Sequence, residues 1–203
     1  MGCDIHVFVE HKLWYGERKG EWFSCDHYRK NTYFGTDECE PEFEVIEIYG
    51  GRNYTLFSIL ADVRNYGDNE PISMPKGLPS DCCKDILDES NRWGCDGHSH
   101  SYFTLKELMD WKESHPIATH QGYVSAQAAN ELDRDGKIPD CSWQDGNIKG
   151  QTWRKWSKPN TSLDGLISAL KERTREIFYI YDDNDPRIAE RSEDIRIVFW
   201  FDN

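Results

Sequence analysis

The sequence predicts an α+β fold: a single domain with a mixed or antiparallel sheet that includes both terminal strands, about four helices and long irregular loops. Two observations indicate this. Segments 3–13 and 194–202 alternate apolar and polar residues, as half-buried strands do. Between them lie segments whose apolar residues recur at helical spacing. This order suggests that the two terminal strands are neighbours in one sheet.

The first strand has an unusual second face. Ile5, Val7 and Val9 form an apolar face, and the opposite face carries two acids, an imidazole and a phenyl ring. A solvated sheet face and a functional face are equally good explanations of that composition. The residues of the second face are Asp4, His6, Phe8 and Glu10.

Helical spacing of apolar residues predicts four helices. Segment 54–64 follows a candidate N-cap at Asn53, and segment 105–114 follows the capping box of Thr104 and Glu107, in which each residue satisfies the other's backbone N–H. Segment 125–134 ends before Gly136, and segment 163–179 follows Ser162, a further candidate cap.

The remaining segments predict shorter strands and loops. An aromatic return strand over 21–25 forms a hairpin with the first strand, and 44–49 is a short strand. Segment 36–44 is acidic and predicts an exposed loop. Segment 66–93 has three prolines and no clear period, which is typical of a lid or binding loop.

Segment 140–159 predicts a polar loop with three tryptophans. These could form a platform for a sugar or a base, or they could pack over the edge of the core. We interpret 27–51 and 140–159 as peripheral elaborations of a single domain that spans 1–203.

Composition limits the function classes. The 203 residues carry a formal net charge of −13, which argues against general nucleic-acid binding. No apolar stretch reaches the ~20 residues of a membrane span, and no signal peptide is recognisable. Seven cysteines without an export signal predict free thiols in a reducing cytoplasm.

Segment 93–101 holds the strongest candidate for chemistry. Asp96, His98 and His100 stand at alternate positions, so in an extended backbone all three would point the same way. They could then converge on a metal ion or a phosphate. A polar loop with solvated histidines is the plain alternative. The helix predicted after Thr104 favours an anion at its N-terminus, unless nearby carboxylates offset that field.

The first strand could complete a metal site. Asp4 and His6 share a face and, together with Asp96, His98 and His100, would supply imidazole and carboxylate ligands. Such a set suits Zn²⁺, Mn²⁺ or Fe²⁺, and a metal with an open position lowers the pKa of bound water to ~7. The predicted metal ligands are Asp4, His6, Asp96, His98 and His100, of which the last three are also the predicted catalytic residues.

Four residues are candidates for ligand binding. Arg52 and Arg64 flank the helix at 54–64 and could clamp an anion, or they could pair with the plentiful surface carboxylates. Asn65 and Trp93 are the other two, and a tryptophan or tyrosine would stack on a base.

Several blocks of the sequence resemble a family of uncharacterised proteins of tailed bacteriophages and prophages. These blocks are Met-Gly-Cys-Asp-Ile-His at the start, Phe57 to Asn65, Pro71 to Pro79, Asp96-Gly-His-Ser-His-Ser101 and the final Arg-Ile-Val-Phe-Trp-Phe-Asp-Asn203. The resemblance implies no particular activity. It implies a phage context, hence the host cytoplasm, in which small accessory proteins often modify, degrade or sequester host nucleotides.

Three functions follow as hypotheses. The first is a metal-dependent hydrolase that acts on a small nucleotide or another phosphoester. The second is a non-catalytic protein that sequesters a small anionic ligand such as a nucleotide signal. The third is an acidic protein that occupies a basic site on a host protein and inhibits it. The sequence does not specify an oligomeric state.

Overall fold

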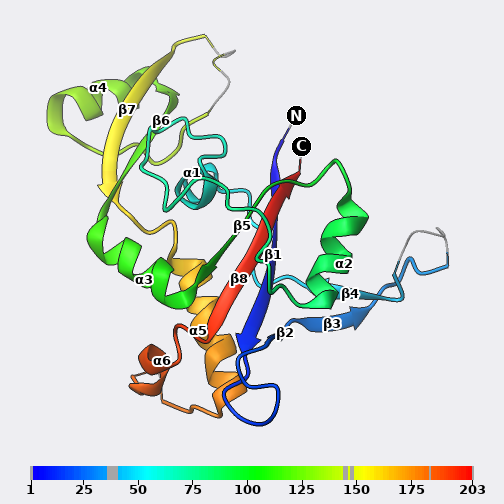
Figure 1. The fold of residues 1–203 in the computed structure, drawn as a ribbon. Helices are drawn as coiled ribbons and strands as arrows, with labels where there is room; N and C mark the ends of the chain where they lie inside the picture. Colours follow the sequence, from blue (N-terminus) through cyan, green and yellow to red (C-terminus); the bar gives the residue numbers. More distant parts are fainter. Residues whose placement is uncertain (1, 36–40, 144–145, 147–148, 183, 203) are drawn as a thin grey trace. The chain divides into compact units, whose positions relative to one another are not determined.

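The computed structural model describes residues 2–35, 41–143, 146, 149–182 and 184–202. Figure 1 shows the α+β arrangement of the elements. In chain order they are β1 (Asp4–Lys12), β2 (Trp22–Ser24), β3 (His27–Lys30), β4 (Phe43–Ile46), α1 (Tyr54–Ala61), α2 (Lys84–Trp93), β5 (His98–Thr104), α3 (Leu105–Ser114), β6 (Ile117–Ser125), α4 (Ala126–Asp135), β7 (Gln151–Pro159), α5 (Asp164–Phe178), α6 (Arg187–Glu190) and β8 (Ile195–Asp202).

The α-carbon packing divides the chain into two compact units, and each is described by itself. The first comprises residues 1–52, 75–110 and 163–203, and the second comprises 53–74 and 111–162. Both units are therefore assembled from segments that are separated in the sequence.

The first unit is built on a four-stranded sheet in the order β2-β1-β8-β5. β8 pairs antiparallel with β1 from Asp4↔Asp202 to His11↔Ile195. The two terminal strands are thus neighbours in an antiparallel sheet, which confirms the prediction. β5 pairs with the other edge of β8, so β8 is central, and seven of its eight residues are buried.

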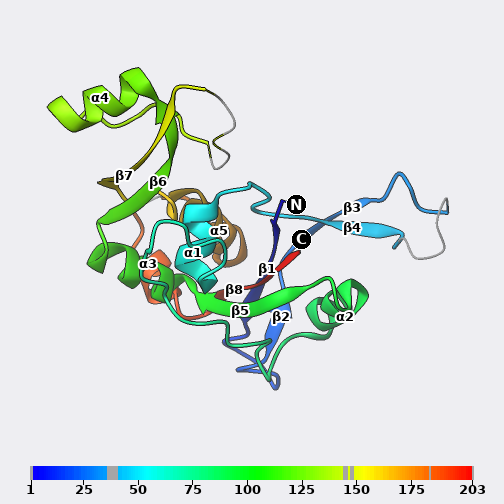
Figure 2. The ribbon, with the colours of Figure 1, turned by 90° about the horizontal axis from the view of Figure 1, so that it is seen from above.

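Both faces of this sheet are covered. The odd-numbered face of β1 (Ile5, Val7 and Val9) is buried. On the even-numbered face Phe8 is also buried and belongs to an apolar cluster with Ile86, Val198 and Trp200. In Figures 1 and 2, α2 and the β3–β4 hairpin lie on one side of the sheet and α5 lies on the other. The second face of β1 is therefore not a solvated sheet face.

The second unit contains α1, the antiparallel β6–β7 ribbon and α4. Asn53 caps α1 through a bond from the Leu56 N–H to its Oδ1 (3.2 Å), as predicted. Ser125 likewise caps α4 by accepting from Ala128 N (3.1 Å). These caps satisfy backbone donors that the first turn of a helix leaves without partners.

Several sequence predictions are wrong in detail. Segment 66–93 contains α2, and segment 140–159 contains β7, which pairs with β6 along its whole length. Six helices occur in the described residues, where the sequence predicted about four, and one of the six, α6, has only four residues. Ser162 does not cap α5, because the N-cap is Leu163 and it makes no side-chain capping bond. The predicted loop over 36–44 lies largely outside the described residues.

The predicted capping box is present at the start of α3. Thr104 N donates to Glu107 Oε2 (2.7 Å), and Glu107 N donates to Thr104 Oγ1 (3.1 Å). Replacing Thr104 by alanine is expected to lower the free energy of unfolding by about 1 kcal/mol, measured by urea denaturation. Thr104→Ser keeps the hydroxyl and is expected to be nearly neutral. Equal losses in both variants would contradict the capping role.

Candidate functional site

The two stretches predicted to carry function meet within the first unit. His6 on β1 packs against Trp93 at the end of α2, with ring centroids 4.0 Å apart and ring planes tilted by 35°. Asp96 lies in the turn that follows and lines the same pocket as His6 and Trp93. His6, Trp93 and Asp96 are therefore brought together.

Two glycines shape this turn. Gly94 ends α2 at a positive φ of 52°, which is strained for other residues. At Gly97 a Cβ atom would lie 3.2 Å from Trp93 Cβ and 3.3 Å from Trp200 Cδ1. The close approach of the backbone to these two side chains explains glycine between Asp96 and His98.

His98 and His100 do not point the same way, so the predicted convergence with Asp96 is wrong. A β-bulge interrupts β5 between His98, opposite Phe201, and Ser101, opposite Phe199. Ser99 lies in this bulge and has a left-handed backbone conformation, with a φ of 55°. A bulge breaks the two-residue alternation of side chains.

The rings of these histidines consequently have different neighbours. His98 stacks on Phe201, and its Nε2 is buried without a hydrogen bond in the described structure. His100 stacks on Trp200 and shares a 2.9 Å hydrogen bond between Nε2 and Ser90 Oγ of α2. Burial lowers the pKa of His100, and the nearby His98 acts in the same direction. Through these two contacts His100 connects α2 to β8 of the sheet.

Asp4 is paired with Arg52. The guanidinium donates to both carboxylate oxygens, from Nε at 2.7 Å and from Nη2 at 2.5 Å. These bonds lower the pKa of Asp4. Arg52 also lies against Gly2, where a Cβ atom would meet the guanidinium. Arg52 would therefore have to leave its ion pair with Asp4 to bind a ligand, and Asp4 would have to leave it to bind a metal.

His6 lies between two carboxylates. Its Nδ1 is 3.0 Å from Glu47 Oε1, and its Nε2 is 3.4 Å from Asp202 Oδ2. Burial would lower the pKa of His6, but the hydrogen bonds and charges of Glu47 and Asp202 outweigh it, so the pKa is raised. A carboxylate acceptor at each ring nitrogen favours the imidazolium form, in which both nitrogens donate.

The raised pKa gives a signed pH dependence. A base whose folded-state pKa exceeds its unfolded value stabilises the fold below the unfolded pKa of ~6.5, and this contribution is lost as pH rises through the folded pKa. Glu47→Gln is therefore expected to cost more stability at pH 6 than at pH 9, as measured by denaturation at both pH values. An equal cost at both would contradict the ion pair.

The five predicted metal ligands do not form one ligand set. Asp4 is bound to Arg52, His6 lies between carboxylates, and the bulge separates the other histidines. Across the described ranges, no group of three or more His, Cys, Asp or Glu side chains is arranged to hold a metal ion. The metal site stays a prediction that this geometry does not favour.

Arg64 and Asn65 belong to the second unit and follow α1. Arg64 adopts a left-handed φ of 51°. The Asn65 amide donates to Asp62 Oδ1 (2.6 Å) and to Asn69 O (2.8 Å), and its Oδ1 accepts from Asn69 N (2.9 Å). These bonds give Asn65 a structural role in the turn.

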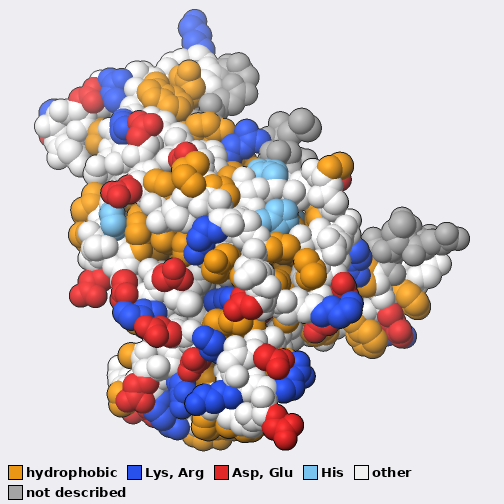
Figure 3. Space-filling model, in the orientation of Figure 1, with side chains coloured by type: hydrophobic (Ala, Val, Ile, Leu, Met, Phe, Trp, Pro, Cys, Tyr) orange, Lys and Arg blue, Asp and Glu red, His pale blue; other side chains and the backbone are white. Residues whose placement is uncertain are grey.

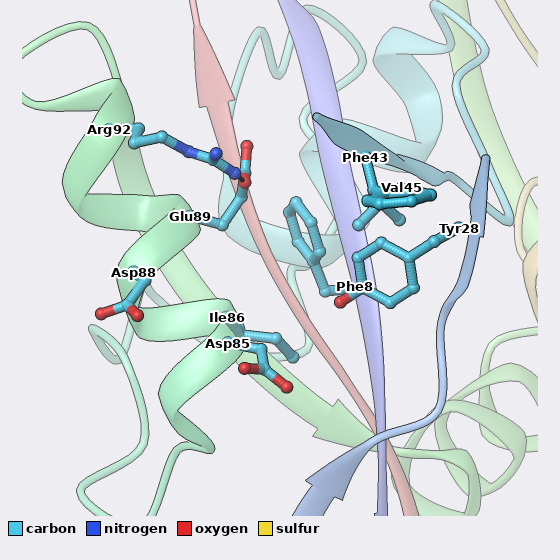
Figure 4. A pocket seen from close by; sticks show the side chains of 9 residues that line it. All are labelled: Phe8, Tyr28, Phe43, Val45, Asp85, Ile86, Asp88, Glu89 and Arg92. Carbon is cyan, nitrogen blue, oxygen red and sulfur yellow. Dashed lines mark ion pairs between the residues drawn. The ribbon is translucent and has the colours of Figure 1, made fainter. Parts of the chain in front are cut away.

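A concave surface beside His6 and Trp93 lies between α2 and β4. Two adjoining pockets of about 420 Å³ each share Phe8, Val45, Glu89 and Arg92, and together we call them the α2–β4 groove. Figure 4 shows Phe8, Tyr28, Phe43 and Val45 converging between β4 and α2. The groove is lined by His6, Phe8, Tyr28, Pro41, Phe43, Glu44, Val45, Glu47, Asp85, Ile86, Asp88, Glu89, Arg92, Trp93 and Asp96.

The rim of the groove is acidic. Six carboxylates and one guanidinium line it, and their formal charge of −5 becomes −4 when His6 is protonated. Arg29 and Lys84 offset part of this charge from outside the lining by pairing with Glu44 and Asp88. Asp85 and Asp96 form no ion pair within the described part of the chain, so the rim keeps an excess of negative charge.

The β3–β4 hairpin exposes apolar side chains beside the groove. Tyr28 is 48% exposed, Phe43 53% and Ile46 45%. Figure 3 shows hydrophobic side chains at the surface near the hairpin, next to acidic and basic ones. Exposed aromatic residues at the edge of a concave surface are typical of binding interfaces.

Most of the groove was not predicted from the sequence. The sequence does contain a pattern that indicates α2. Ile86, Ser90 and Trp93 recur at helical spacing, and they form the narrow face of the helix that packs inward. Asp202 could also have been found, since antiparallel pairing of the terminal strands places it opposite Asp4. No local pattern indicated that β4 would lie beside α2.

A second missed feature is a buried ion-pair network beneath the start of α2. Glu10 is fully buried and accepts from Arg196 Nε (2.5 Å) and from Cys83 N (2.6 Å). Arg196, 4% exposed, also donates to Asp81 Oδ1 (2.8 Å) and lies over the Trp22 ring. Every charge in this network is satisfied, which gives it a structural role.

Comparisons with known proteins add no assignment: no family model matches the chain, and no curated protein or solved structure matches it. No helix of the described residues is long and apolar enough to span a membrane.

Proposed function

We propose that this protein is a binding protein whose α2–β4 groove holds a positively charged segment of a partner protein. The observation that carries the proposal is the lining of the groove, in which six carboxylates surround an aromatic and aliphatic floor. Complementary charge steers a partner and selects against partners of the same sign. In the phage context that the sequence resemblance implies, the partner would be a host protein that the complex inhibits.

The floor of the groove supplies contacts for the apolar part of a basic side chain. Lysine and arginine stems pack on apolar surface while their charged ends stay near water or carboxylates. Trp93 and Tyr28 add aromatic faces that attract cations, and Asp96 lies in the same pocket as Trp93. A partner segment with basic and apolar residues fits both properties.

The two other hypotheses receive less support. A sequestered anion would meet the carboxylate rim, and like charges in contact oppose binding. A metal-dependent hydrolase needs ligands that converge, and the predicted ligands are held apart. Elemental analysis of protein purified without a histidine tag tests the hydrolase separately, because a stoichiometric transition metal that is lost in a His98→Ala, His100→Ala variant would revive it.

The proposal is tested by calorimetric titration with two short capped peptides of equal length. One alternates arginine with valine, and the other alternates glutamate with valine. We expect saturable one-to-one binding of the basic peptide that weakens as salt screens the charges, and no binding of the acidic one. Absence of binding to the basic peptide, or equal binding of both, would refute the proposed function.

A further inference from the structure

The outer edge of β4 carries backbone groups that have no strand partner in the described residues. β3 and β4 form a two-stranded sheet. Asn31 N donates to Glu42 O (2.9 Å), and the register continues through Arg29↔Glu44 and His27↔Ile46. In an antiparallel pair alternate residues direct their N–H and C=O groups toward and away from the partner strand. Phe43 and Val45 therefore direct theirs away from β3.

This outer edge borders the groove. The side chains of Phe43 and Val45 line the groove, and Figures 1 and 2 both show β4 lying between β3 and α2, so the outer edge of β4 is on the side of α2. An unpaired strand edge is a template for a further strand. Here the edge runs beside a helix, so a strand added to β4 would lie in the groove between β4 and α2.

We propose that the partner segment binds as an extended strand that pairs antiparallel or parallel with β4, with basic and apolar residues in alternation. This inference rests on the proposed function and specifies how the groove recognises its partner. Main-chain hydrogen bonds to Phe43 and Val45 would supply affinity, and pockets for alternate side chains would supply specificity, as in other cases of strand addition.

Charge complementarity selects the occupant. In a strand, alternate side chains point to opposite faces, so one set would reach the floor formed by Phe8, Val45 and Ile86, and the other would reach the rim. The rim carries the carboxylates of Glu47, Glu89 and Asp96, so lysine or arginine is expected at the partner positions that reach the rim. An acidic segment or a nucleic acid would place negative charge against the same rim.

Amide hydrogen exchange measured by NMR tests the pairing directly. With the arginine–valine peptide at saturation, exchange at Phe43 and Val45 is expected to slow by about tenfold or more, because hydrogen-bonded amides exchange only on opening. Exchange at Glu44 and Ile46, whose amides already face β3, is expected to change little. Unchanged exchange at Phe43 and Val45 in the bound state would overturn strand addition, while binding itself would leave the proposed function intact.

A pair of variants and a pair of modified peptides complete the test. Val45→Pro removes the outward N–H and spares the bonds to β3, so peptide affinity is expected to fall about fivefold or more. Val45→Ala shortens the side chain in the groove but keeps the N–H, so its loss of affinity is expected to be clearly smaller. Peptides N-methylated at odd or at even positions should differ, because only one set faces β4. Equal binding of both methylated peptides would overturn the proposal even if Val45→Pro fails to fold.

A second copy of this chain is an alternative occupant with a distinct signature. It would slow exchange at Phe43 and Val45 in the absence of peptide, and the effect would grow with protein concentration. That result would also overturn the proposal, since the edge would then be an interface between copies.

Discussion

Replacing Arg196 by methionine is expected to lower the free energy of unfolding by about 3–5 kcal/mol. The change leaves Glu10, which is fully buried, without the guanidinium that lies 2.5 Å from its Oε2. An unpaired buried carboxylate carries a desolvation penalty that nothing offsets. Denaturation in urea at pH 7, followed by tryptophan fluorescence, measures the loss.

Two further variants separate the buried charge from the loss of packing. Adding Glu10→Gln to Arg196→Met removes the unpaired charge and keeps an acceptor for Cys83 N, so the double variant is expected to be more stable than the single one. Arg187→Met disrupts an exposed pair with Asp185 and should change stability by less than about 1 kcal/mol. Equal losses at Arg196 and Arg187 would contradict this account.

Neutralising three carboxylates of the groove is expected to weaken binding of the arginine–valine peptide by about tenfold or more at low salt. The variant combines Glu44→Gln, Glu89→Gln and Asp96→Asn, residues that line the groove. It also frees Arg92, the ion-pair partner of Glu89, to repel a basic ligand. Isothermal titration calorimetry at two salt concentrations measures the change.

A matched variant controls for net charge. Glu17→Gln, Glu190→Gln and Glu193→Gln remove the same number of charges from exposed residues that line neither pocket of the groove. Its affinity for the peptide is expected to stay close to that of the wild type. Similar weakening in both variants would mean that overall charge, and not the groove, attracts the peptide.

The sequence predicted those parts of the fold that local patterns encode. The terminal strands were recognisable because both alternate over eight or more residues, and their pairing follows from their shared sheet. The caps at Asn53 and Thr104 were recognisable because a single side chain satisfies the helix donors there. α2 was missed because its inward stripe is narrow and three prolines precede it.

The candidate site was only partly predictable. The stretches around His6 and Asp96 do meet at one pocket, which Trp93 also lines. The prediction that Asp96, His98 and His100 converge assumed a regular strand, and the bulge at Ser99 broke that alternation. Long-range partners such as Glu47 for His6 depend on tertiary packing, which no spacing within the sequence encodes.

Mapping the binding site of the arginine–valine peptide by amide chemical shifts tests the central claim most directly. The account predicts that the largest changes occur in β4 and α2, with a change in the Trp93 indole signal as the peptide enters the groove between these elements. Changes confined to other elements, or spread evenly over the acidic surface, would contradict the claim that this groove is the binding site.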